Sequence, residues 1–327
     1  MRAPLTRAEV LRPFAAIASF GDPQSPAALL VLLQLLYDVG RRDLPMGRLL
    51  EGHVDALQIV HRYGSPSQAE CAAKAARGGR LFGVWNADQL DDPTLLVAGS
   101  LSGGKAFASG AGLVTDALIS VDVEGRRQLI LLDLDLVRPT LDRSWWRVTG
   151  MKRSETHMAH WADQPVAEGA LIGAPGDYVR EPHFGGGAIR FAAVQAGGIA
   201  ALADLVRDHL VGAKRGDDPF QRARLADLHR HAQAAADAVR GAALCWSNTD
   251  VPGTIARVAA ARNAVYSAGE AALSLASAAV GLQAMFDDHP LSATMRDLDT
   301  YLRQPGPDAQ RLLAGKAVLD GVLAAAL

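Results

Sequence analysis

The apolar positions change their period twice along the chain. In the first part they recur at steps of three and four residues, as in 53–64 (HVDALQIVHRYG) and 68–79 (QAECAAKAARGG). This spacing predicts amphipathic helices, and Pro-bearing breaks at Asp22-Pro23 and Ser65-Pro66 separate them. We therefore expect a short helical domain over residues 1–80.

From residue 81 the period shortens to two. The segments 117–123 (ALISVDV), 127–134 (RQLILLDL) and 145–150 (WWRVTG) alternate between apolar and polar positions, with turns expected at Glu124-Gly125 and Pro165. Alternation of this kind is typical of strands that bury one face, most often in antiparallel sheets. The pattern predicts a mostly antiparallel β-domain over residues 81–183.

After the Gly-rich stretch 184–187 the helical period returns in long Ala-rich segments. Helices are predicted over 188–210, 220–245, 254–285 and 291–301, with a last helix near the end. Helices of this length joined by short loops are typical of a bundle, which we expect over residues 184–327. The predicted fold class is α+β and multidomain, in the order N-terminal helices, β-domain and helical bundle.

Composition excludes several classes of protein. The 327 residues are 49% hydrophobic with a formal net charge of −2, so the chain can bury a large core but has no basic surplus for binding nucleic acid. The apolar run near residue 30 is interrupted by Gln34, Tyr37 and Asp38, too early for a membrane span. Two cysteines, Cys71 and Cys245, are too few for a disulfide framework. We expect a soluble cytoplasmic protein.

Candidate chemistry gathers in residues 81–112. Two apolar strand-like runs end there in small residues, and Gly103-Gly104 leads into Lys105, Phe107 and Ser109. Gly99 to Lys105 also satisfies most of a phosphate-binding loop, but Ala106 stands where a Ser or Thr should bind magnesium, and no amphipathic helix follows. A β-hairpin with a Gly-Gly turn is the interpretation that the local sequence favours.

The histidines give weaker signals. His157 and His160 look like metal ligands, but they would point to opposite faces of a strand and no third ligand is near in sequence, so we expect a surface loop. Gly185 to Gly187 could cradle a phosphate through free N–H groups, or provide flexible backbone where a helix begins.

Several motifs resemble those of acyl-CoA dehydrogenases, whose domain order is the one predicted above. His61 to Gly64 with Gln68 resembles the lead-in to that family's β-domain, and Val84-Trp85-Asn86 stands in the place of its V-T-E-P loop. Three further segments resemble the G-x-K-x-W-I-T-N strand, the G-x-R-x-S segment and the signature of the last helices, namely 104–110, 150–154 and 280–297.

The resemblance implies a non-covalently bound FAD between the β-domain and the bundle. Phe107 and Ser109 then match the flavin-ring contacts, with the Ser109 hydroxyl donating to flavin N5, and an inward-facing strand aromatic is the alternative for Phe107. Trp85 and Asn86 match the loop beside flavin and substrate. Contacts to the rest of the dinucleotide, in part from a neighbouring subunit of a homodimer or homotetramer, fall on Gly281, Leu282, Arg222 and Arg224.

One departure from the family concerns the reaction. The position of the usual general-base Glu is Pro305, which cannot take a proton. Asp217 or Asp218 are weak substitutes, since an exposed helix cap explains them better. The leading hypothesis is an oxidoreductase that passes a hydride from an acyl-CoA or similar thioester to flavin N5. A flavin-dependent monooxygenase and a non-catalytic scaffold are the alternatives.

Overall fold

The computed structural model describes residues 3–17, 21–123, 125–304 and 306–325. The first helices are α1 (Arg7–Leu11), α2 (Pro26–Arg42), α3 (Leu44–Tyr63) and α4 (Pro66–Arg77), with a 3-10 turn, η1 (Pro13–Ala16). Polar side chains fix where they begin. Ser25, Asp43 and Ser65 each accept a hydrogen bond from the first turn of the helix that follows, and each helix has a proline in that turn, where no backbone donor is lost.

Within the described residues eight strands form one sheet. They are β1 (Phe82–Trp85), β2 (Leu95–Val97), β3 (Ser100–Ala108), β4 (Asp116–Val123), β5 (Arg126–Asp133), β6 (Thr140–Asp142), β7 (His157–Pro165) and β8 (Leu171–Ile172). The order is β6-β7-β3-β2-β4-β5-β8, and β1 also pairs with β4. Short 3-10 turns η2 (Lys152–Ser154), η3 (Glu168–Ala170) and η4 (Asp177–Val179) lie among the later strands.

The sheet corrects three details of the sequence prediction. It is mixed, because β1 and β2 both pair with β4 in parallel. Residues 145–150 form an irregular loop instead of a strand. The hairpin between β2 and β3 turns at Ala98 and Gly99, both at positive φ, whereas Gly103 lies within β3, where a Cβ atom would stand 2.2 Å from the Pro93 carbonyl oxygen.

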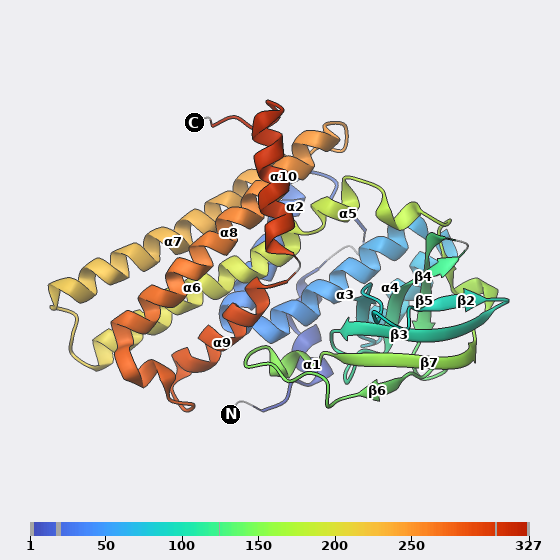
Figure 1. Cartoon of the computed structure of the whole chain (residues 1–327), viewed down its shortest axis with the longest axis horizontal. Coiled ribbons are helices and arrows are strands. Elements are labelled where there is room, and N and C mark those ends of the chain that lie inside the picture. Colours follow the sequence, from blue (N-terminus) through green and yellow to red (C-terminus); the bar gives the residue numbers. More distant parts are fainter. Residues whose placement is uncertain (1–2, 18–20, 124, 305, 326–327) are drawn as a thin grey trace.

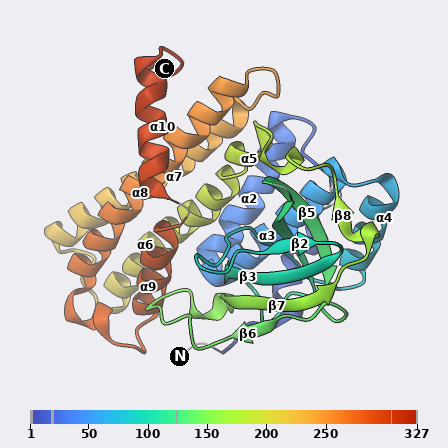
Figure 2. The same ribbon diagram turned by 45° about the vertical axis from the view of Figure 1, so that its right-hand side comes forward.

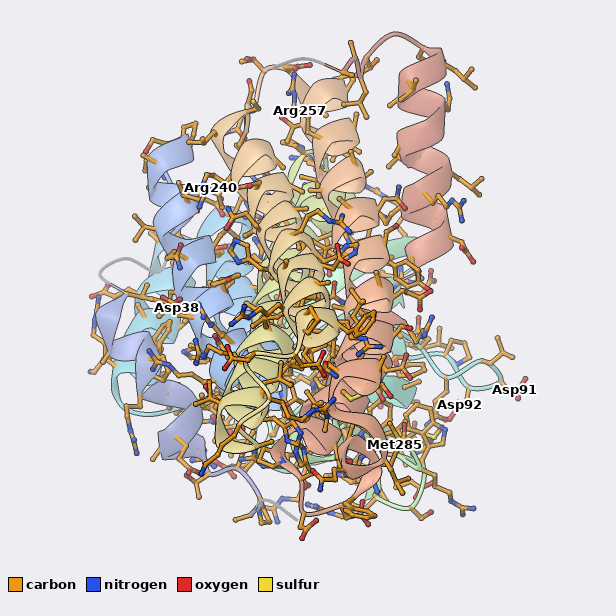
Figure 3. All side chains as sticks on the ribbon, turned by 90° about the vertical axis from the view of Figure 1, so that its left-hand side faces the viewer. Asp38, Asp91, Asp92, Arg240, Arg257 and Met285 are labelled. Atoms are coloured by element: carbon orange, nitrogen blue, oxygen red, sulfur yellow. The ribbon has the colours of Figure 1, made fainter. Side chains whose placement is uncertain are left out.

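The remaining helices form a bundle beside the sheet. They are α5 (His183–Gly186), α6 (Ile189–Gly212), α7 (Pro219–Leu244), α8 (Val251–Val280), the 3-10 turn η5 (Gly281–Met285), α9 (Pro290–Leu302) and α10 (Pro307–Leu319). Figure 1 shows α6 to α9 on one side, the sheet on the other and α3 between them, while α10 packs against α8 and extends beyond the bundle. The view in Figure 2 shows the same separation. In Figure 3, Asp91 and Asp92 lie on the loop between β1 and β2, which projects away from the helices.

Two long helical stretches are apolar enough to cross a membrane by length and composition alone. They are His183–Gly212 and Val251–Met285, and 78% and 39% of their apolar windows are buried inside the protein. The core helices of soluble proteins share these properties.

Helix α3 is tied to the sheet by a buried histidine. The backbone N–H of Phe82 in β1 donates to His53 Nδ1 at 3.0 Å, and the His53 ring packs edge-on against Phe14. Burial lowers the pKa of His53 to about 3, so the ring is neutral at physiological pH and this nitrogen can accept. The first residue of the sheet is thereby fixed against the middle of α3.

The sheet is tied to the bundle through the loop 145–151 and helix α9. Gly150 N–H donates to Thr300 Oγ1 at 3.1 Å, and Met151 N–H donates to Asp297 Oδ1 at 2.5 Å. A Cβ atom on Gly150 would stand 1.8 Å from the Arg296 carbonyl oxygen, so only glycine lets the two backbones approach this closely.

We predict that Gly150→Ala lowers the free energy of unfolding by about 3 kcal/mol, because the added methyl group must push α9 away from the loop. Urea denaturation followed by circular dichroism measures this change. Gly241→Ala is the control. Gly241 lies within α7, and a Cβ atom added there would meet nothing within 4 Å, so alanine should stabilise the helix by about 0.5–1 kcal/mol. An equally well-tolerated alanine at residue 150 would disprove the close contact.

Candidate functional site

A cavity of about 1100 Å³ lies where the sheet, α3, the start of α6 and α9 meet. This volume lies just above the range of about 300–1,000 Å³ that is typical of small-molecule sites. One wall comes from the β-domain and includes Val84, Asn86, Phe107, Ser109 and Trp146. We call the opposite wall, formed by Arg48, Glu51, Asp55, Arg190 and Arg262, the charged wall.

A bulge in β3 shapes the β-domain wall. The register of β3 with β7 shifts between Lys105 and Ala108, and Phe107 has φ of 53°, a conformation that bulky residues rarely adopt. Bulges redirect side chains and are common beside active sites. Here the Phe107 ring is 46% exposed at the cavity and meets Trp145 edge-on at 4.8 Å. The bulge presents an aromatic edge to the cavity.

Polar groups surround this aromatic edge. The Ser109 hydroxyl lines the cavity and accepts a hydrogen bond from Thr156 at 3.4 Å. The Asn86 side-chain oxygen accepts from Ser120 Oγ at 2.7 Å and from Arg127 Nη1 at 2.8 Å, which fixes the amide in one orientation. The β-domain wall therefore combines apolar surface with a few oriented polar groups, as binding sites for planar ring systems do.

Lys105 lies beneath this wall and forms no phosphate-binding loop. Its side chain is fully buried, forms an ion pair with Asp88 and also donates to the Asn86 carbonyl oxygen at 3.3 Å. Burial lowers the pKa of Lys105 to about 8. A lysine held in this way inside a strand cannot neutralise a bound phosphate.

The charged wall joins three helices. On α3, Arg48 Nη1 donates to Glu51 Oε2 at 2.7 Å, and the Arg48 guanidinium lies 5.0 Å from the centre of the Phe191 ring. Asp55, one turn further along α3, forms an ion pair with Arg190 of α6. Arg262 of α8 completes the wall, and burial lowers its pKa to about 10. These contacts fix α3 against the start of the bundle.

Glu51 is the most deeply buried acid of this wall, with a side chain only 1% exposed. Its burial and the neighbouring Asp55 carboxylate raise the pKa of Glu51 to about 7, although Arg48 and Arg190 oppose the shift. A carboxyl group with this pKa exchanges its proton near neutral pH, which is the range that acid–base chemistry requires.

Three of the predicted cofactor residues line the cavity, namely Asn86, Phe107 and Ser109. Trp85 does not. It is buried in the core, and its indole N–H donates to the Ser109 carbonyl oxygen at 2.9 Å, so it supports the wall from behind. Successive residues of a strand face opposite sides, which is why Trp85 and Asn86 cannot both face one ligand.

The other predicted site residues lie outside the cavity lining of this chain. Gly281 and Leu282 form the turn η5 after α8, with Leu282 75% exposed. Arg222 pairs with the exposed Asp217, and Asp218 caps the N-terminus of α7. Arg224 lies on the same helix. Pro305 lies outside the described residues, and the neighbouring Gly306 lines the cavity.

The histidine and glycine candidates have structural partners. His157 and His160 lie in β7, not in a surface loop, and pair with Glu155 and Asp92 respectively. No group of three or more metal-ligating side chains occurs among the described residues. The N–H of Gly185 donates to the Glu181 carboxylate at 2.8 Å, so it is not available to a phosphate.

Sequence reasoning missed the charged wall, although part of its signal was readable. Arg48, Glu51 and Asp55 recur at steps of three and four residues, which places them on one face of an apolar helix. Such a charged stripe on a helix that is otherwise buried indicates a polar cavity or a solvated face. Arg190 and Arg262 lie beside this stripe only because the helices pack together, and helix packing leaves no pattern in the sequence.

Comparison with known proteins identifies the fold. No family model matches the chain, and no curated protein matches its sequence. The structure is similar to methanesulfinate monooxygenase from Pseudomonas fluorescens (TM-score 0.81, 17% identity, 98% of this chain and 89% of that chain). It is similar to FMN-bound dibenzothiophene monooxygenase from Paenibacillus sp. A11-2 (TM-score 0.77, 17% identity, 91% of this chain and 84% of that chain). It is also similar to butyryl-CoA dehydrogenase from Megasphaera elsdenii (TM-score 0.74, 16% identity, 91% of this chain and 83% of that chain).

The chain therefore has the fold that acyl-CoA dehydrogenases share with these monooxygenases. The predicted order of N-terminal helices, β-domain and helical bundle is confirmed.

We predict that the stability of the protein depends on pH through Glu51. Because the folded state raises the pKa of Glu51 from 4.5 to about 7, the favourable contribution of the protonated group is complete below pH 4.5 and is lost as the pH rises through 7. Relative to Glu51→Gln, the wild type should lose about 3 kcal/mol of unfolding free energy between pH 5 and pH 8.

Urea denaturation of both proteins at several pH values measures this difference. Glu70→Gln, at an exposed position on α4, is the matched control and should track the wild type across the series. A difference between wild type and Glu51→Gln that does not change with pH would show that Glu51 stays ionised in the folded protein.

Proposed function

We propose that this chain is a flavin-dependent monooxygenase. The observation that carries the proposal is the cavity itself, with an aromatic and polar β-domain wall facing a charged wall. The β-domain wall fits a flavin ring, because Phe107 and Trp146 offer aromatic edges while Ser109 and Asn86 offer hydrogen-bonding groups. Similarity to an FMN-bound structure supports the same assignment.

A bound flavin supplies redox chemistry toward organic substrates and molecular oxygen that side chains alone lack. The chain's own residues would hold the ring, orient the substrate and exclude water. Ser109, Phe107 and Asn86 would contact the ring from the β-domain side. FAD stays the prediction from the sequence, and the cavity accommodates the ring of FMN and FAD alike.

The charged wall favours a monooxygenase over an acyl-CoA dehydrogenase. An acyl chain is stabilised by apolar surroundings, whereas this wall carries five ionisable side chains. Its two carboxylates, Glu51 and Asp55, are both engaged by arginines. The sequence also has Pro305 at the position that the resemblance gives to the general base. Oxygen insertion needs no base there, so the order of the two leading hypotheses is reversed.

A non-catalytic scaffold is less consistent with the cavity. A large void lined by buried charges lowers stability unless a ligand fills it. A chain that only supported a partner would have no physical reason to keep one.

We propose a homo-oligomer, as the resemblance implies. Large apolar side chains are exposed on the last elements, among them Leu282, Phe286, Leu312 and Leu319. Contacts between copies would cover such side chains. They would also provide a role for Gly281, Leu282 and the Arg222–Arg224 segment at the cavity of a neighbouring copy.

The first test is flavin binding. Purified protein titrated with FMN or FAD should give the visible absorption spectrum of bound oxidised flavin, and Ser109→Ala and Phe107→Ala should each weaken binding about fivefold, since a hydrogen bond or an aromatic contact contributes about 1 kcal/mol. Leu90→Ala, at a fully exposed loop position, should bind like the wild type. A protein that takes up neither flavin would disprove both enzyme hypotheses and leave the scaffold.

A second measurement separates the two enzymes. The flavin-loaded protein should keep its oxidised spectrum during anaerobic incubation with a panel of acyl-CoA thioesters, and its turnover should require reduced flavin supplied by NADH and a flavin reductase. Bleaching of the spectrum by a thioester would establish a dehydrogenase instead.

A further inference from the structure

The charged wall carries an excess of positive charge. It contains three arginines, Arg48, Arg190 and Arg262, against two carboxylates, Glu51 and Asp55. Arg48 pairs with Glu51, and Arg190 pairs with Asp55. Buried charge is expensive unless opposite charge compensates it, so the excess of arginines over carboxylates makes this wall a favourable environment for an anion.

Several buried polar atoms of the wall also lack hydrogen-bond partners, among them Arg48 Nε, Arg190 Nε and Glu51 Oε1. Arg190 Nε and Glu51 Oε1 are buried without one, in side chains that are only 9% and 1% exposed. The two atoms lie 3.8 Å apart, beyond hydrogen-bonding distance. Unsatisfied groups at this depth are rare in folded proteins, and the free Arg190 Nε–H is a donor that an anionic ligand can use, whereas Glu51 Oε1 can only accept from a donor.

Aromatic surface adjoins these charges. Phe191 lies beneath the Arg48 guanidinium, and Tyr178 packs edge-on against Phe184 at 5.1 Å, all lining the same cavity. A ligand at this wall would therefore place an anionic group on the arginines and an apolar or aromatic body on the rings.

We propose that the charged wall is the substrate subsite and that it binds a small organic carboxylate. The planar fork of a guanidinium group matches the two oxygens of a carboxylate, which a neutral or cationic group cannot reproduce. This inference rests on the proposed function, because it takes the cavity as the active site and the β-domain wall as the place of the flavin ring.

The test uses benzoate as the probe and benzamide as its neutral counterpart. Isothermal titration calorimetry on the flavin-loaded protein should show that benzoate binds at least about tenfold more tightly than benzamide. At pH 8, where Glu51 is ionised, Glu51→Gln removes negative charge from the wall but keeps its shape, so it should tighten benzoate binding about tenfold. Because this variant gains affinity, loss of folding cannot mimic the expected result.

Removing positive charge should have the opposite effect. Arg262→Met, and Arg190→Met combined with Asp55→Asn so that no carboxylate is stranded, should each weaken benzoate binding about tenfold or more. Arg41→Met is the matched control. Arg41 forms a comparable pair with Asp204 between α2 and α6 but lies outside the cavity lining, so benzoate affinity should stay unchanged.

The outcomes separate this inference from the proposed function. Equal binding of benzoate and benzamide, or an unchanged affinity in Glu51→Gln, would overturn the carboxylate subsite. Displacement of bound flavin by benzoate would overturn it too, since the wall would then belong to the cofactor. If the protein takes up no flavin but still binds benzoate with the expected response to each variant, the subsite stands and the flavin assignment fails.

Discussion

The ion pair between Arg190 and Asp55 is the interaction on which the cavity depends. It joins the start of α6 to the middle of α3, the helix that lies between the bundle and the sheet. Two residues earlier, about half a turn, His53 fixes the other side of α3 to β1. Because α3 is held from both sides, the space beside it cannot collapse, and the side chains that face this space keep their positions. Replacement of such a pair by apolar residues would often be tolerated for stability, so its presence is better explained by what the cavity binds.

The β-domain wall reflects a second constraint, the strained turn of β3 at Phe107. A positive φ at a bulky residue is costly, and such conformations persist only where surrounding structure enforces them. Trp145 and Trp146 stack on one another and meet the Phe107 ring edge-on, while Gly150 in the same loop is clamped against α9. The docking of the sheet on the bundle and the shape of the cavity wall therefore depend on one loop.

The sequence predicted what depends on local pattern. The order of helices, strands and helices follows from apolar periodicity, and Asn86, Phe107 and Ser109, which were predicted from a loop motif and a strand motif, line the cavity. The prediction failed where contacts between residues far apart in the sequence determine the structure. The parallel pairing of β1 with β4 has no local signature, and the alternating residues 145–150 form a loop because Gly150 must meet α9. Trp85, which was predicted beside the flavin together with Asn86, is buried behind the wall, as the period of two of its strand requires. Only the part of the charged wall that lies on α3 leaves a pattern in the sequence, since Arg190 and Arg262 reach α3 through the packing of the bundle.

The fold alone does not decide the chemistry, because acyl-CoA dehydrogenases and monooxygenases share it. What distinguishes them here is the character of the wall opposite the β-domain. An acyl chain is stabilised by apolar surroundings, whereas the wall of this chain offers arginines paired with carboxylates. A buried, charged wall suits a compact polar substrate. The arginines would orient its anionic group by electrostatic attraction, whereas an acyl chain would be recognised by its length. The same net positive charge that would destabilise an empty cavity becomes favourable once such a substrate compensates it.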